Sequence, residues 1–140
     1  MNHFEDLLKY TRLNRKHITK KSFKQYYNDL QLGKIKDKRL VEDLLDGAMD
    51  SDCENIVKII QNSYNILQTS ESKKIEVNGV MDSKTITSIN DYKNPLELFV
   101  WVNMNKFNYL KEKNSSNEFM KEWINDKIIH SVKDYFENKE

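Results

Sequence analysis

Acidic side chains recur along the segment that follows Asp37. Asp43, Asp46 and Asp50 are spaced i, i+3 and i+7, which places them on one face of an α-helix, and Asp52 follows just beyond. Such a cluster can raise the pKa of one carboxyl for acid–base work, or hold a hard cation. A chain of 140 residues with 22 acids produces such clusters readily. The sequence therefore favours a solvated acidic face over a site.

The residues that usually bind metals or attack substrates are few. His3, His17 and His130 are far apart, and Cys53 is the only cysteine, which excludes an intramolecular disulfide and a cysteine-based zinc cluster. Cys53 begins a predicted helix, where the dipole can lower the pKa of a thiol, although a packing role is simpler. No Gly-rich phosphate loop and no Ser/His/Asp order occur. We predict no metal and no cofactor.

Positive charge is concentrated near the N-terminus. Met1–Arg39 has eleven Lys and Arg against four Asp and Glu, a net charge of +7, whereas Leu40–Glu140 has a net charge of −6, so the whole chain has +1. Such a chain offers a basic arm to an acidic partner, or folds the arm onto its own acidic body. No acid lies between Leu7 and Asn28, and the cations of this basic arm are Lys9, Arg12, Arg15, Lys16, Lys20, Lys21 and Lys24.

Aromatic residues alternate with these cations. Basic groups beside aromatic rings suit phosphate contacts and base stacking, which makes nucleic acid a candidate partner. However, Phe23, Tyr26 and Tyr27 share the helical face that must pack, so we expect these rings to lie in the core.

The elements that position these groups are helices. Apolar residues recur at helical spacing over residues 4–11, 20–30, 38–49, 52–67, 83–89, 95–110 and 119–136. Predicted N-caps are Thr19, Asp37, Ser51 with Glu54 as a capping box, and Ser83 or Asp82; Pro95 suits a first helical position, and Gly33 a helix end. Residues 75–80 predict at most a β-turn or a short strand. The sequence therefore predicts one all-α domain, 1–140, of about six to seven helices.

Composition excludes several classes. A mean hydropathy of −0.81 and the lack of a long apolar run exclude a membrane span. The acidic start of the chain predicts no signal peptide, so the location stays open between the cytoplasm, a phage virion and release to the cell wall. Three Gly and one Pro make all-β and collagen-like architectures improbable.

Four stretches, read in order, resemble one family. Leu44–Asp52 is similar to "Phe-Asp-x-Ala-Val-Asn-x-Gly", and Ile56–Gln61 to "Ala-x-x-x-Leu-Gln". Val77–Ile86 is similar to "Val-Asp-Gly-x-x-Gly-Pro-x-Thr", and Phe119–Lys127 to "Phe-x-x-Gly-Trp-x-Asn-Arg". Together they resemble the C-terminal, predicted peptidoglycan-binding part of the phage and bacterial muramidases of glycoside hydrolase family 108. The resemblance covers residues 18–130, which include the last part of the basic arm, and leaves residues 1–17 as the basic N-terminal helix and 131–140 as the end of the last helix.

The resemblance implies a lysozyme-like helical fold that contacts peptidoglycan or a protein partner. The ligand-binding candidates that it suggests are Asp46, Asp50, Asn78, Thr85, Trp123 and Asn125. The family's catalytic acid belongs to a Glu-Gly-Gly motif that this chain lacks, so we predict a non-catalytic binding or structural module and no catalytic residue. Two alternatives remain: an active muramidase that uses Glu5, Asp46 or Asp50, and a virion-assembly or nucleic-acid-binding protein that uses the basic arm. The oligomeric state stays open.

Overall fold

The structure is a computed structural model that describes residues 3–113 and, beyond them, Lys121, Glu122, Asn125, Ile129, Lys133 and Glu137. Within these residues the chain forms six α-helices and two 3-10 turns, and no strand. The prediction of an all-α domain is confirmed. The predicted helix over residues 119–136, with Trp123, lies mostly outside the described residues.

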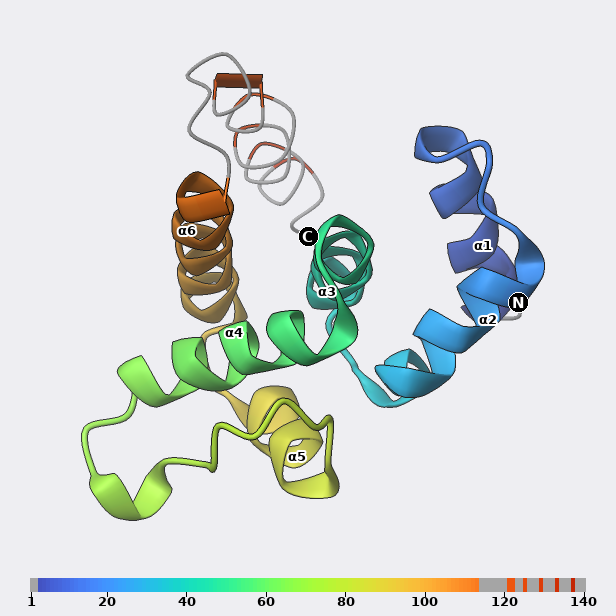
Figure 1. The fold of residues 1–140 in the computed structure, drawn as a ribbon. Helices are drawn as coiled ribbons and strands as arrows, with labels where there is room; N and C mark the ends of the chain where they lie inside the picture. Colours follow the sequence, from blue (N-terminus) through green and yellow to red (C-terminus); the bar gives the residue numbers. More distant parts are fainter. Residues whose placement is uncertain are drawn as a thin grey trace.

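The central helix is α4 (Cys53–Ile66). It contacts α3 (Lys38–Asp50), α5 (Ser83–Asp91) and α6 (Pro95–Lys113), and Figure 1 shows these three helices arranged around it. At one side of this body, α1 (His3–Asn14) and α2 (Lys20–Asp29) contact each other, and α2 contacts α3. The 3-10 turns are η1 (Leu32–Lys34) and η2 (Glu71–Lys73). None of the described helices combines the length and the apolar character that crossing a bilayer requires.

The core explains why these helices form where they do. The apolar stripes of α3 and α4 meet, and Leu40, Leu44, Ile56 and Ile60 are no more than 1% exposed. Gly47 lets the two helices approach closely, because a Cβ at this position would lie 2.3 Å from Ile56 Cδ1. Side chains from the other helices complete this core: Leu7, Leu8, Phe23, Ile86, Ile89, Leu98 and Val102.

Most predicted helix starts are confirmed. Thr19 accepts a hydrogen bond from Ser22 N, Asp37 from Arg39 N and Leu40 N, and Asp82 from Thr85 N, while Pro95 is the first residue of α6. These acceptors satisfy backbone N–H groups that have no partner within the helix.

One predicted helix start, Ser51, and one predicted helix end, Gly33, are wrong, because side chains at or near them form other hydrogen bonds. Ser51 does not cap α4; its hydroxyl donates to Gly47 O of α3 at 2.9 Å, and Asp52 caps α4 by accepting from Asn55 N. Gly33 does not end α2; Gln31 adopts the left-handed φ of 50°, and its Nε2 donates to Met81 O at 2.5 Å. This bond to a distant loop holds Gln31 in a backbone region that glycine would otherwise favour.

The segment 75–80 forms a turn and no strand. The side chain of Asn65, on α4, forms hydrogen bonds with both backbone polar groups of Ile75. Ile75 N donates to Asn65 Oδ1, and Asn65 Nδ2 donates to Ile75 O, each at 2.8 Å. Because the side chain of Asn65 satisfies the backbone N–H and C=O of Ile75, this residue needs no neighbouring strand for its hydrogen bonds. Gly79 has a φ of +77°, as expected for a turn that requires a positive φ.

Candidate functional site

The basic arm is folded onto the body. Leu7, Leu8 and Phe23 belong to the core, and the ring of Phe4 lies 5.0 Å, centroid to centroid, from the rings of both Phe23 and Tyr27. The expected packing role of these aromatic residues is therefore confirmed. Of the two arrangements that the charge asymmetry suggests, the structure has the one in which the arm joins the acidic body.

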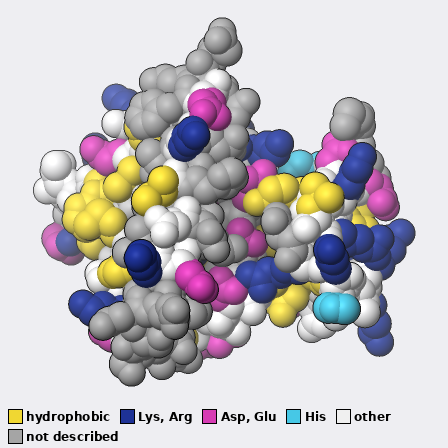
Figure 2. Space-filling model, turned by 90° about the horizontal axis from the view of Figure 1, so that it is seen from above, with side chains coloured by type: hydrophobic (Ala, Val, Ile, Leu, Met, Phe, Trp, Pro, Cys, Tyr) yellow, Lys and Arg dark blue, Asp and Glu magenta, His cyan; other side chains and the backbone are white. Residues whose placement is uncertain are grey.

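Most of the arm's cations face solvent. Lys9, Arg12, Lys16, Lys20, Lys21 and Lys24 are exposed, and Arg15 is half-buried. Arg15 Nη2 lies 2.7 Å from Asp50 Oδ1, and Lys20 Nζ lies 3.6 Å from Glu5 Oε1. The other five cations have no ion-pair partner among the described residues. Figure 2 shows Lys and Arg side chains gathered over this part of the molecule, and we call α1, α2 and residues 15–19 between them the basic corner.

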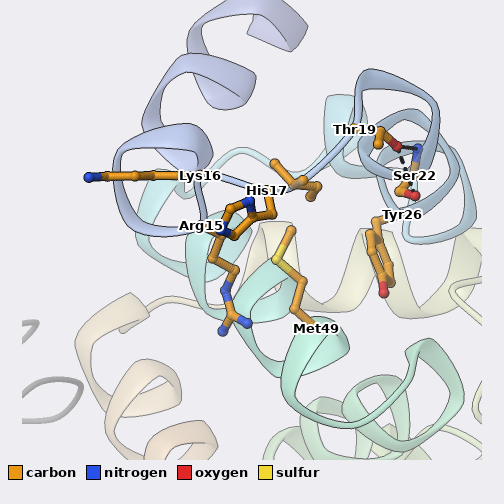
Figure 3. Close-up of a pocket in the computed structure, with 8 residues that line it drawn as sticks. Arg15, Lys16, His17, Thr19, Ser22, Tyr26 and Met49 are labelled. Atoms are coloured by element: carbon orange, nitrogen blue, oxygen red, sulfur yellow. Dashed lines mark hydrogen bonds between the residues drawn. The ribbon is translucent and has the colours of Figure 1, made fainter.

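A pocket of about 550 Å³ opens where the basic corner meets α3 (Figure 3). The corner contributes two cations, an imidazole, two hydroxyls and a phenol ring, and α3 contributes a thioether. The lining residues are Arg15, Lys16, His17, Ile18, Thr19, Ser22, Tyr26 and Met49. Thr19 donates to Ser22 Oγ at 3.0 Å, drawn as a dashed line in Figure 3. Cations, hydroxyls and an aromatic face together suit an anionic group attached to a ring.

Two of the predicted ligand-binding residues meet around a glutamine that is fully buried. Gln61 Nε2 donates to Asn78 Oδ1, Val80 O and Thr85 Oγ1, each at 3.0 Å. Gln61 Oε1 accepts from Asn78 N at 3.1 Å and from Gly79 N at 3.0 Å. Asn78 and Thr85 therefore hold the turn over residues 78–80 against α4, and we call these contacts the Gln61 network.

Thr85 also links this network to the start of α5. Hydrogen bonds from the hydroxyl and the backbone N–H of Thr85 hold the pKa of Asp82 below its ordinary value. Thr85 is 1% exposed, so its side chain serves the fold and offers nothing to a ligand. The backbone N–H of Thr85 donates to the capping carboxylate of Asp82, and its hydroxyl contacts Asp82 and Gln61.

The remaining predicted ligand-binding residues do not join this pair. Asp50 is bound to Arg15, and Asp46 is half-buried on α3. Asn125 is exposed, and Trp123 lies outside the described residues. Among the described residues, the structure brings together Asn78 and Thr85 alone.

The acidic face of α3 is not simply solvated, which corrects the sequence interpretation. Asp43 is 6% exposed, and its Oδ2 accepts from Asn103 Nδ2 at 2.7 Å. Lys106 Nζ lies 3.2 Å from Asp43 O and 3.9 Å from Asp43 Oδ1, and its side chain is 4% exposed. This buried pair joins α3 to α6. The signal that could have revealed it is a lysine on the apolar stripe of α6, between Val102 and Leu110.

Two other titratable groups of the body are perturbed. Burial raises the pKa of Glu42 to about 7; Lys38 and Arg39 lower it, and Asp43 and Asp46 raise it further. Burial also raises the pKa of the Cys53 thiol, and Asp29 and Asp52 add to this effect. The idea of a thiol activated by the helix dipole is therefore wrong, and Cys53 packs against the core. No group of three His, Cys, Asp or Glu among the described residues is arranged to hold a metal ion.

The chain matches no protein-family model, no curated protein and no solved structure. The muramidase resemblance therefore stays a prediction from the sequence, to be judged by the positions of the residues that carry it.

Proposed function

We propose that the chain is a non-catalytic, peptidoglycan-binding module on a muramidase-like scaffold. The observation that supports this proposal is the Gln61 network. Gln61, Gly79 and Thr85 are positions at which the chain keeps the family's residue, and they come from two separate stretches of the resemblance. They meet in the fold through hydrogen bonds of 3.0 Å. Residues kept for the scaffold are expected to form such internal contacts.

The absence of a catalytic role is supported by the positions of the candidate acids. Glycoside hydrolysis needs a protonated acid and a second carboxylate on either side of the scissile bond. Glu5 faces solvent beside Lys20, and Asp50 is bound to Arg15. Glu42 has a raised pKa, but its side chain is only 14% exposed, and it lines neither the pocket of about 550 Å³ at the basic corner nor the pocket of about 510 Å³ beside Tyr64 and Tyr92.

Co-sedimentation with purified peptidoglycan sacculi tests this function. We expect the chain to pellet with the sacculi while the turbidity of the suspension stays constant. A chain that remains in the supernatant at every salt concentration would contradict the proposal. Clearing of the suspension that is lost in Glu5→Gln would instead identify a working muramidase.

Nucleic-acid binding is the second candidate function, and the basic corner is the observation that favours it. Five exposed cations of the corner have no ion-pair partner among the described residues, and one of them, Lys16, lines a pocket that also offers hydroxyls and Tyr26. Each cation that meets a phosphate releases counterions, so binding should weaken steeply as salt is raised.

A matched pair of double variants tests this candidate. Lys21→Gln with Lys24→Gln removes two charges from the corner, and Lys84→Gln with Lys111→Gln removes two exposed charges from the body. If DNA binds at the corner, the first variant reduces the slope of log K against log salt by about 1–2 relative to the native chain. The second variant should leave the slope unchanged. Equal slopes for all three chains would exclude the corner as a nucleic-acid surface.

A further inference from the structure

The geometry points to a saccharide-binding pocket at the end of the body opposite to the basic corner, and we propose that it takes a muropeptide: an N-acetylated aminosugar with a carboxylate-bearing peptide. This inference rests on the proposed peptidoglycan binding and assigns it a site. The pocket has a volume of about 510 Å³ and lies between the C-terminal end of α4, η2, and the end of α5 with the loop to α6.

Two tyrosines form the aromatic part of the pocket. Tyr64 and Tyr92 are both half-buried, and their rings lie 6.0 Å apart with an interplanar angle of 73°. The Tyr92 hydroxyl donates to Glu97 Oε1, which fixes the orientation of this ring. Burial, followed by this bond to Glu97, raises the pKa of Tyr92 to about 12, so the phenol stays protonated. The two rings pack edge to face against each other, and both residues line the pocket, where they offer apolar surface to the C–H groups of a sugar.

Polar groups around the rings are available to a ligand. Gln68 Nε2 donates to Tyr64 O at 3.1 Å, whereas Gln68 Oε1 accepts no hydrogen bond from the described residues. Lys73, Asp91 and Lys93 also line the pocket and have no ion-pair partner in the described part of the chain. A pocket with aromatic walls and a few unpaired polar groups is the usual form of a small-ligand site.

The mixture of charges selects the class of ligand. Phosphodiesters are disfavoured because the carboxylate of Asp91 lines the same pocket as the two lysines. A neutral glycan would use the rings and Gln68 but leave both lysines without a partner. A muropeptide uses all of these groups: its sugar hydroxyls and N–H donate to Gln68 and Asp91, and its peptide carboxylates pair with Lys73 and Lys93.

Titration of the ¹⁵N-labelled full chain with a purified disaccharide tetrapeptide, followed by NMR, tests the assignment. We expect the perturbed amides to cluster at residues 64–73 and 87–94. Lys93→Ala should weaken binding about tenfold, as expected for a lost charge-assisted hydrogen bond. Lys84→Ala, which removes an exposed lysine from α5 outside the pocket, is the matched control and should bind as the native chain does. Chitotriose, which lacks carboxylates, should bind more weakly and be insensitive to Lys93→Ala.

Two outcomes would overturn the inference. Perturbed amides confined to the basic corner would place the ligand elsewhere, and equal affinities of Lys93→Ala, Asp91→Ala and the native chain would exclude these side chains. Either result, combined with native co-sedimentation on sacculi, removes the pocket and leaves the proposed function. Failure of co-sedimentation removes the function itself, whatever the titration shows.

Discussion

The basic corner and the body are stabilised in different ways. The corner is attached through Leu7, Leu8 and Phe23, and most of its cations remain in solvent. The body has buried polar side chains: Gln61 is 0% exposed and Lys106 is 3% exposed, and both have hydrogen-bond partners. Charge in the corner is therefore available to a partner, whereas Gln61 and Lys106 of the body are already used by the fold.

This difference separates stability from binding. Removing a buried polar side chain leaves its partners unsatisfied, which costs more than the bond itself contributed. Removing an exposed cation loses little, because its charge is solvated in the folded and unfolded states alike. Substitutions in the body should therefore change stability, and substitutions in the corner should change association.

The largest effect is expected for Gln61→Leu. The variant keeps the side-chain volume but loses five hydrogen bonds, to Asn78, Gly79, Val80 and Thr85. Leaving these groups unsatisfied should lower the free energy of unfolding by about 3–5 kcal/mol. Urea denaturation measures it. Gln25→Leu, at an exposed position on α2, is the control and should stay within about 0.5 kcal/mol of the native chain. Similar losses for both would show that the buried network has no special role.

Lys106→Met should destabilise by about 3 kcal/mol, since it removes the buried ammonium group that lies 3.2 Å from Asp43 O and 3.9 Å from Asp43 Oδ1. Adding Asp43→Asn removes the carboxylate charge that faced Lys106 and should recover part of this loss, which a double-mutant cycle measures. Lys111→Met, at an exposed position on the same helix, is the control. A double variant whose loss equals the sum of the single losses would mean that Asp43 and Lys106 do not interact.

Glu42→Gln should stabilise the protein by about 1–2 kcal/mol at pH 8, a value reduced for the nearby lysine and the partial access of solvent. The native pKa of about 7 lies above the ordinary 4.5, so the folded state binds the proton more tightly. The stability contributed by Glu42 is therefore complete below about pH 4.5 and is lost as the pH rises through about 7. Thermal unfolding between pH 4 and pH 8 measures this. Glu112→Gln, at an exposed position, should show no such trend.

The smallest effect is expected for Arg15→Ala. The Arg15–Asp50 ion pair at 2.7 Å joins the corner to α3, but both side chains are more than a quarter exposed. We expect a loss of about 0.5 kcal/mol, decreasing as salt is raised. A loss above 2 kcal/mol in urea denaturation would show that charge, and not the apolar contacts, attaches the corner to the body.

The helical periodicity and the capping side chains were sufficient to predict the helices, because both act within a few residues of the chain. Thr19, Asp37 and Asp82 cap as predicted for this reason. The roles of Ser51 and Gln31 were not predicted, because each side chain forms a hydrogen bond that the capping patterns do not include. Ser51 donates to Gly47 O of the preceding helix, and Gln31 donates to Met81 O, fifty residues away. The muramidase resemblance named Asn78 and Thr85 as ligand-binding residues, but their side chains face Gln61.

The sequence by itself determined the all-α class, most of the helix starts and the separation of a +7 segment from a −6 remainder. These follow from residue order alone. The tertiary structure decided which polar residues are internal, because burial depends on which helices meet. It placed Asp43, which the sequence assigned to a solvated face, in the contact between α3 and α6 together with Lys106. Among the described residues, it also placed polar groups without a protein partner at the basic corner and around the pocket lined by Tyr64 and Tyr92.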